Sequence, residues 1–245
     1  MARSRRIDFA GARHHVMNRG VRRQPVFFEA GDYRHFLSLL GELPERFGLR
    51  VHGFALMPNH FHLLVESRDA RLSSAMKQLG ANFTQWTNAR RGWDGPLFRG
   101  RFRSKLVADD AWWQHLLAYV HLNPVRAGLV ETADDAVWTS HASYVDGIAP
   151  PWLTTGELLA ALGGPVGYGA LIDSVQAAGA ASSSAPQALW RAGGQPTRPP
   201  SLTGDEARWV ARAELARLHS SGDRRGRWLL AWWLQRRTGW SCVAL

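Results

Sequence analysis

Two histidines separated by one apolar residue form the first group with chemical potential. His60 and His62 flank Phe61 in an apolar run typical of a strand. Because side chains alternate along a strand, both imidazoles project from one face and Phe61 points to the other. Two imidazoles one strand repeat apart can share a metal cation. The pattern fits two polar positions on a half-exposed sheet equally, so the spacing alone leaves both interpretations open.

A tyrosine and an asparagine four residues apart form the second group. Tyr119 and Asn123 occupy one face of an expected helix that stops before Pro124. A phenol oxygen can act as a nucleophile and form a covalent phosphotyrosine. An amide oxygen is a hard ligand that suits Mg²⁺ or Mn²⁺. The structural alternative makes Tyr119 an amphipathic core residue and Asn123 the end of the helix.

Basic side chains in two segments form the third group. An expected strand over 97–107 has an apolar face and a basic face, and the basic face carries Arg99, Arg101, Arg103 and Lys105. A turn after the first expected strand adds Arg19, Arg22 and Arg23. Together these cations could hold a nucleic-acid backbone in a salt-dependent manner. A charged edge strand that resists aggregation is the alternative.

The elements that must position these groups follow from hydrophobic periodicity. Strands are expected over 13–19, 50–57, 60–66 and 97–107, and helices over 33–47, 73–90 and 110–122. Asp32 and Asp109 or Asp110 are the expected N-caps, and Gly48 is an expected helix stop. The order β-α-β-β-α-β followed by a helix predicts an α+β, ferredoxin-like fold. In that plan the sheet is antiparallel, both helices cover one face and the other face is free.

Composition limits the classes of function. The chain has 245 residues, and its 30 Lys and Arg against 20 Asp and Glu give a formal net charge of +10. A polyanionic partner such as nucleic acid fits this balance. The single cysteine excludes a disulfide framework and a cysteine-rich zinc module. No apolar run has the length of a membrane span, and the basic N-terminus leads into no apolar signal region. We therefore expect a soluble intracellular protein without membrane contact.

The chain is expected to divide into three parts. Residues 1–150 form the domain that carries all three chemical groups, and residues 151–204 form an extension and a linker rich in Ala, Ser, Pro and Gly. Residues 205–245 form a C-terminal segment with two expected helices. This segment is similar to the start of a helix-turn-helix that ends where the recognition helix would begin. A small helical hairpin that closes a core is the alternative.

Two longer stretches resemble a known family. Residues 57–65 (MPNHFHLLV) are similar to the motif of two histidines around one hydrophobic residue in the HUH single-tyrosine transposases. Residues 118–130 (AYVHLNPVRAGLV) resemble the tyrosine-helix motif of the same family. Within it, the REP-associated tyrosine transposases of bacteria are the most similar branch, and the segments around Arg19-Gly20 and 95–102 fit them as well. The resemblance covers about residues 1–150.

The resemblance implies a mechanism and a set of site residues. His60, His62 and Asn123 would bind a divalent metal, Mg²⁺ or Mn²⁺, and Tyr119 would attack a phosphate of DNA. A 5′-phosphotyrosine and a free 3′-OH would result, and that 3′-OH could later rejoin the strand. The substrate would be single-stranded DNA with palindromic hairpins, held by the arginines and Lys105 of the third group, in the bacterial cytoplasm at the nucleoid.

Several alternatives stay open at this stage. A domain that grips structured single strands without cutting them is one, and a metal nuclease that uses water in place of Tyr119 is another. The target sequence, the choice between monomer and homodimer, and the use of Tyr119 within one chain or across two also stay open.

Overall fold

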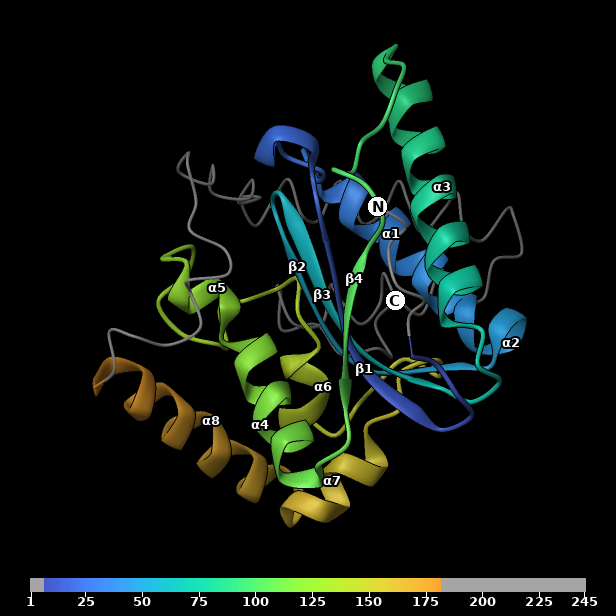
Figure 1. Ribbon diagram of the computed structural model, residues 1–245. Helices are drawn as coiled ribbons and strands as arrows, with labels where there is room; N and C mark the ends of the chain where they lie inside the picture. Colours follow the sequence, from blue (N-terminus) through green and yellow to red (C-terminus); the bar gives the residue numbers. More distant parts are fainter. Residues whose placement is uncertain (1–6, 182–245) are drawn as a thin grey trace, which may run out of the picture.

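The computed structural model describes residues 7–181 (Figure 1). The four strands are β1 (Ala12–Arg19), β2 (Leu49–Met57), β3 (His60–Ser67) and β4 (Arg103–Val107). The helices are η1 (Val21–Arg23), α1 (Ala30–Gly41), α2 (Leu43–Phe47), α3 (Leu72–Arg91), α4 (Asp110–His121), α5 (Asn123–Arg126), α6 (His141–Val145), α7 (Gly156–Leu162) and α8 (Gly164–Ala181). The expected C-terminal segment 205–245 and most of the linker before it lie outside the described residues.

The strands form one antiparallel sheet in the order β2-β3-β1-β4. This order, with α1 and α2 between the first two strands and α3 between the last two, confirms the predicted ferredoxin-like plan. The histidine pair belongs to β3, which lies between β2 and β1 and therefore has a strand on either side. A central strand holds its side chains more firmly than an edge strand, because its backbone is hydrogen-bonded along both sides.

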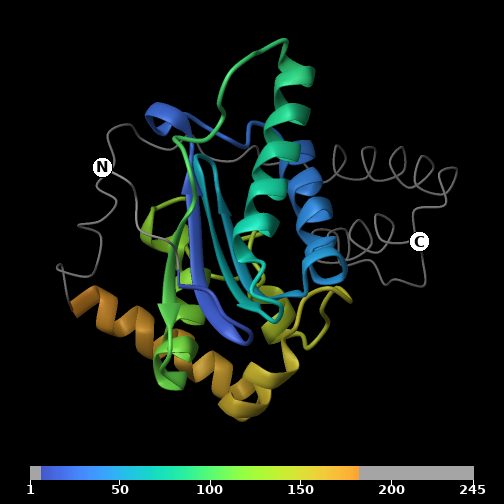
Figure 2. The same cartoon turned by 45° about the vertical axis from the view of Figure 1, so that its right-hand side comes forward.

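Helices α1 and α3 cover one face of the sheet, as Figure 2 shows. The main core lies between these helices and the sheet, and it is built from apolar side chains of alternate strand positions and of both helices. Phe36 of α1 and Phe83 of α3 are fully buried there and meet edge to face, with ring centroids 5.1 Å apart. Phe61 reaches the same core, with its ring centroid 4.9 Å from that of Phe36. The residue between the two histidines therefore anchors β3 from behind.

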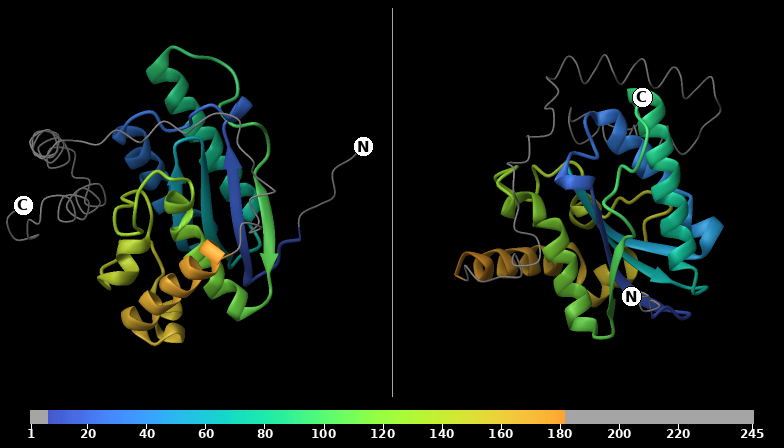
Figure 3. Two further views of the ribbon diagram at one scale, coloured as in Figure 1. Left: turned by 90° about the vertical axis from the view of Figure 1, so that its left-hand side faces the viewer. Right: turned by 45° about the horizontal axis from the view of Figure 1, so that its top comes forward.

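The opposite face was expected to be free, and this expectation is wrong for its lower half. Helix α4 packs on β2, β3 and β4, and α8 packs in turn on α4 and α6 (Figure 3). A second core forms there, with Leu64 of β3, Leu117 of α4 and Ile172 of α8 among its members. A Cβ built on Gly53 of β2 would lie 2.9 Å from a methyl carbon of Leu117, so a glycine permits the close approach of α4. The tyrosine-bearing helix thus lies directly on the sheet.

The expected helix over 33–47 is two helices. It breaks at Glu42, and Pro44 falls in the first turn of α2, where a proline costs no hydrogen bond. Asp32 was expected as the N-cap but is the third helical residue. The N-cap is Glu29, and Asp32 accepts its backbone N–H at 3.1 Å in a capping box. Gly48 ends α2 in the left-handed conformation, as predicted.

The expected strand over 97–107 is also shorter than predicted. Only Arg103–Val107 pairs regularly with β1, and upstream a single bridge joins Phe98 to Gly20. Gly100 interrupts the strand with a φ of 153°, which side-chain-bearing residues rarely adopt. The even alternation that would have put four basic residues on one face is lost at this point.

In the described part of the chain, no single helix is long and apolar enough to cross a membrane. Helices α7 and α8 meet the length and composition criteria only as a pair, and the chain bends by 75° between them.

Candidate active site

The register of the sheet places the histidine pair in a row of polar side chains on the α4 face. His62 lies opposite Met17 of β1, and His60 lies opposite Arg19. One step along β1, His15 lies opposite Lys105 of β4. Directly opposed residues of antiparallel strands point to the same side of the sheet. The two predicted histidines therefore share this face with a third, His15, and with Arg19 of β1 and Lys105 of β4.

The three imidazoles are in contact. Nε2 of His15 lies 2.9 Å from Nδ1 of His62, and the two rings are stacked with centroids 5.1 Å apart. The rings of His60 and His62 meet edge to face, with centroids 5.0 Å apart. His15 and His62 are almost completely buried, and His60 is partly exposed. The pair thus opens toward solvent on the His60 side.

Asn59 fixes the orientation of the His60 ring. Its amide nitrogen donates to the carbonyl oxygen of Arg23 at 3.3 Å, so its amide oxygen faces the histidine. That oxygen lies 2.6 Å from Nδ1 of His60 and can only accept a hydrogen bond. Nδ1 of His60 therefore carries the proton, and Nε2 carries the lone pair that a metal requires.

Tyr119 of α4 lies beside the histidine group. Its ring approaches the rings of His15 and His62 edge-on, at centroid distances of 6.2 and 6.3 Å. The guanidinium of Arg126 lies 5.1 Å from the centre of the Tyr119 ring. Helix α4 begins at the cap Asp109, whose side chain accepts the backbone N–H of Trp112 at 2.6 Å. This cap and the second core position the tyrosine over the sheet.

Asn123 lies at the start of α5, one residue after α4 ends at Leu122. Its amide nitrogen donates to the backbone carbonyl of Tyr119 at 2.8 Å and to that of Val120 at 3.3 Å. The amide nitrogen is thus used within the helix, and the amide oxygen is the end of the side chain with the capacity to bind a cation. The structure therefore keeps Asn123 and Tyr119 together across the helix break.

Burial controls the charge of the site. It lowers the pKa of His15 to about 4, and nearby Lys105 acts in the same direction. Burial also lowers the pKa of His60 to about 4, assisted by Arg19, and places that of His62 well below its usual value. Burial raises the pKa of the Tyr119 phenol, and Arg126 opposes that rise. At neutral pH the imidazoles are neutral, which is the form that ligates metals.

These residues fit a divalent cation. The candidate donors are two neutral imidazoles, His60 and His62, and one amide oxygen, that of Asn123. Nitrogen and oxygen donors of this kind suit Mn²⁺ and related first-row cations, and the amide oxygen also suits Mg²⁺. Because Nδ1 of His60 carries the proton, the lone pair available to a metal is on Nε2.

A second group could hold a cation by distance alone. Ligand atoms of His52, Glu66 and Glu157 all lie within 4.8 Å of one another. Arg50 lies among the same carboxylates, with Nη1 2.8 Å from Oε1 of Glu157 and 3.8 Å from Oε2 of Glu66. The single guanidinium of Arg50 thus pairs with both carboxylates and would compete with a cation for them.

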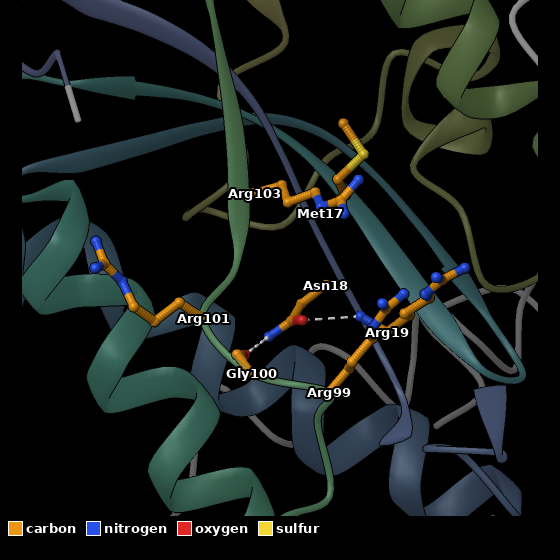
Figure 4. Close-up of a pocket in the computed structure, with 7 residues that line it drawn as sticks. All are labelled: Met17, Asn18, Arg19, Arg99, Gly100, Arg101 and Arg103. Carbon is orange, nitrogen blue, oxygen red and sulfur yellow. Dashed lines mark hydrogen bonds between the residues drawn. The ribbon is translucent and has the colours of Figure 1, made fainter. Parts of the chain in front are cut away.

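Five of the predicted DNA-binding residues gather at the upper end of β1. Arg19, Arg99 and Arg103 line a cavity of about 80 Å³ together with Asn18, whose amide nitrogen donates to the carbonyl of Gly100 at 3.2 Å (Figure 4). Arg22 and Arg23 line a neighbouring depression with Arg19 and Arg99. Burial lowers the pKa of Arg19, and repulsion from Arg99, Arg23 and Arg103 acts in the same direction. Such a cluster of positive charges would attract a phosphate group.

Two of the predicted basic residues lie apart from this cluster. Arg101 borders the cavity but points away from the other arginines, toward α3 (Figure 4). Lys105 lies lower on β4, opposite His15 and beside the histidine–tyrosine group. The expectation that four basic residues of 97–107 share one face is therefore wrong for Arg101, because Gly100 breaks the alternation.

Sequence reasoning missed three residues of the site: His15, Asn59 and Arg126. The alternation of β1 could have indicated His15, since His15 and Arg19 lie on the same face of a strand that was correctly predicted. The local pattern does not show which side chains of β1 and β3 meet, and the role of Asn59 depends on a contact with Arg23, 36 residues away.

Fold and site together define a ferredoxin-like α+β protein with a buried histidine–tyrosine centre beside an arginine cavity. The model of the family described as "Transposase IS200 like" matches residues 9–123. Among solved structures, the chain is similar to a REP-associated tyrosine transposase bound to a REP hairpin, at 18% identity and a TM-score of 0.52. That similarity covers 63% of this chain and 92% of the other and shows a shared fold.

A further solved structure is that of a protein from Deinococcus radiodurans R1 described as a candidate transposase. It is 18% identical over 46% of this chain and 92% of the other, and its TM-score of 0.33 carries no argument. No curated protein matches the chain. The matched residues 9–123 contain all four strands, the histidine pair and Tyr119.

Proposed function

We propose that this protein cuts and rejoins single-stranded DNA beside a palindromic hairpin, through a covalent bond between DNA and Tyr119. The carrying observation is the contact of the Tyr119 ring with His15 and His62, at 6.2 and 6.3 Å between ring centroids. A tyrosine with only a structural role has no need of a neutral histidine cluster beside it. The family match over 9–123 and the hairpin bound to the similar REP-associated protein support the same proposal.

The residues divide into three roles. His60, His62 and Asn123 would hold a divalent cation, Mg²⁺ or Mn²⁺, which when bound polarises the scissile phosphate and stabilises negative charge on it. Arg19, Arg99 and Arg103 would bind the neighbouring phosphates and fix the strand in register. Tyr119 would be the nucleophile, with Arg126 favouring its deprotonated form.

In the cleavage step, Oη of Tyr119 forms a bond to the phosphorus and the bond from phosphorus to the 3′ oxygen breaks. The phenol loses its proton and the departing 3′ oxygen gains one, so protons balance. A 5′-phosphotyrosine and a 3′-OH result, and the reverse attack by a 3′-OH rejoins the strand without a nucleotide cofactor. Because Tyr119 and His62 of the same chain are adjacent, one chain can supply all the parts.

The decisive test is a denaturing gel of the protein with labelled hairpin-bearing single-stranded DNA taken from the sequence that flanks its gene. We expect a covalent adduct that requires Mn²⁺, is abolished by EDTA and is absent in Tyr119→Phe. Tyr33→Phe is the matched control, because it removes a buried hydroxyl on the far side of the sheet that has no hydrogen-bond partner among residues 7–181. Cleavage without an adduct would indicate a water-using nuclease, and binding without cleavage a DNA-binding module.

A further inference from the structure

His15 is a buried residue beside the candidate metal site that takes no part in the proposed cleavage step. It is 4% exposed, and its Nε2 lies 2.9 Å from Nδ1 of His62. Burial of an imidazole without a function is unfavourable, because a polar ring loses its water. The side chain therefore needs an explanation beyond packing.

The contact uses a particular pair of atoms. Nε2 of His15 meets Nδ1 of His62, and the two nitrogens of one imidazole direct their lone pairs or protons away from each other. A cation bound at Nε2 of His62 would therefore lie on the side of the ring remote from His15. This geometry makes His15 a partner of the ligand and excludes it as a ligand of the same cation.

The same arrangement occurs at the other histidine. Nδ1 of His60 donates to the amide oxygen of Asn59, whose orientation is fixed by Arg23, and this leaves the lone pair of His60 at Nε2. For both rings to present Nε2 to one cation, His62 must likewise carry its proton at Nδ1. A hydrogen bond from Nδ1 of His62 to Nε2 of His15 achieves this.

We propose that His15 is a positioning residue that accepts the Nδ1 proton of His62 and so holds the Nε2 lone pair of His62 toward the metal. The inference rests on the proposed metal site at His60 and His62. Outer partners that fix the tautomer of a metal-binding histidine commonly change metal affinity by 10–100-fold when removed. Two strands thus serve the site, since β3 supplies the ligands and β1 supplies the group that sets the tautomer of one of them.

The first measurement needs neither metal nor DNA. Long-range ¹H–¹⁵N correlation spectra of the metal-free protein report which nitrogen of each imidazole carries the proton, and the His62 signals are identified by their loss in His62→Gln. We expect His62 protonated at Nδ1 in the wild type and at Nε2, or in a mixture, in His15→Leu. A wild-type His62 protonated at Nε2 overturns the inference, even if His15→Leu does not fold.

The second measurement is Mn²⁺ binding by calorimetry. We expect His15→Leu to weaken binding by about 10–100-fold and His15→Gln to restore most of it, because a glutamine amide oxygen can accept at the position of Nε2. His14→Gln is the matched control, since His14 is equally buried on the same strand but points to the other face. Wild-type affinity in His15→Leu, or equal loss in both His15 variants, overturns the positioning role.

These readouts are independent of the proposed reaction. A protein that binds Mn²⁺ with the expected tautomers but forms no adduct with DNA would leave the inference standing and refute the proposed function. An adduct that forms normally in His15→Leu, with unchanged Mn²⁺ binding, would refute the positioning role of His15 and leave the proposed function standing.

Discussion

Among the single residues of the site, Arg126 has the clearest effect on chemistry. Its guanidinium lies over the Tyr119 ring and is the group that counters the rise in the pKa of the phenol caused by burial. Removing the positive charge leaves burial unopposed, so the pKa of Tyr119 rises further. Less phenolate is then present at any given pH below that pKa.

We therefore expect Arg126→Gln to slow adduct formation near pH 7 and to move the rising limb of the pH–rate profile to higher pH, while Arg126→Lys retains most of the rate. Single-turnover adduct formation at several pH values measures this. An unchanged profile in Arg126→Gln would mean that the cation has no part in activating Tyr119.

The two candidate cation sites can be told apart with one substitution each. We expect His62→Gln to abolish Mn²⁺ binding and metal-dependent cleavage with the fold retained, because the ligand is lost while His62 belongs to neither hydrophobic core. Glu157→Gln should leave both unchanged, since Arg50 already neutralises that carboxylate. Calorimetry with Mn²⁺ and circular dichroism measure these properties. Normal cleavage in both His60→Ala and His62→Ala would show that the metal assignment is wrong.

At the scale of elements, the segment between α3 and β4 gives the sharpest contrast. Gly100 turns the chain so that Arg99 joins the cavity of Arg19 and Arg103, while Arg101 points toward α3 (Figure 4). Each phosphate contact adds about one unit to the salt dependence of DNA binding. Residues that are neighbours in the sequence should thus differ in what they contribute.

We expect Arg99→Ala to weaken DNA binding at low salt and to reduce the slope of log K against log salt by about one. Arg101→Ala, the matched control, should change the slope much less. Titrations of a fluorescent hairpin at several salt concentrations measure the slope. Equal slopes for the two variants would place the DNA elsewhere.

The sequence predicted most elements but not their irregularities. Strands β1, β2 and β3 and helices α3 and α4 were located to within one residue at each end, because their apolar periodicity is strong. The shortened β4 was missed, since alternation continues through Gly100 in the sequence but not in the backbone. Helix α8 was missed because its glycines indicated a loop, whereas packing against α4, α6 and α7 accompanies its helical state.

The candidate site shows the same division. His60, His62, Tyr119 and Asn123 were singled out because each pair shares a face through a local period, two for a strand and 3.6 for a helix, and the resemblance supplied their expected roles. His15 and Arg126 depend on which strands pair and on how the chain turns after α4. Such contacts form between segments far apart in the sequence, and no local pattern contains them.

On the scale of the whole molecule, a chain of polar side chains runs through the second core. Nδ1 of His121 lies 2.6 Å from the hydroxyl of Tyr168 on α8, and Nε2 lies 2.6 Å from Oγ of Ser140. Burial places the pKa of His121 well below its usual value. The folded protein therefore keeps this ring neutral at pH values where the unfolded chain takes up a proton, and stability falls as the pH decreases below about 6.5.

We expect protonation of His121 in the unfolded chain to lower the unfolding free energy by up to about 1.4 kcal/mol for each pH unit below 6.5. In His121→Gln the unfolding free energy should be lower at pH 7.5 but should decline less steeply between pH 6.5 and 5.5. Urea unfolding in EDTA at three pH values measures both effects. A variant with the wild-type slope would contradict the assignment.

The sheet separates two cores, and the parts of the site are divided between them. The β3 strand is anchored from behind by Phe61 in the core of α1 and α3, whereas Tyr119 depends on the core of α4 and α8. If the α4 layer loosens before the other, the nucleophile withdraws while the imidazoles remain in place. The proposed metal binding and strand cleavage would then be lost at different temperatures, and amide exchange in α4 would report the lower one. A protein built in this way can hold its cation and its DNA while it is unable to cut.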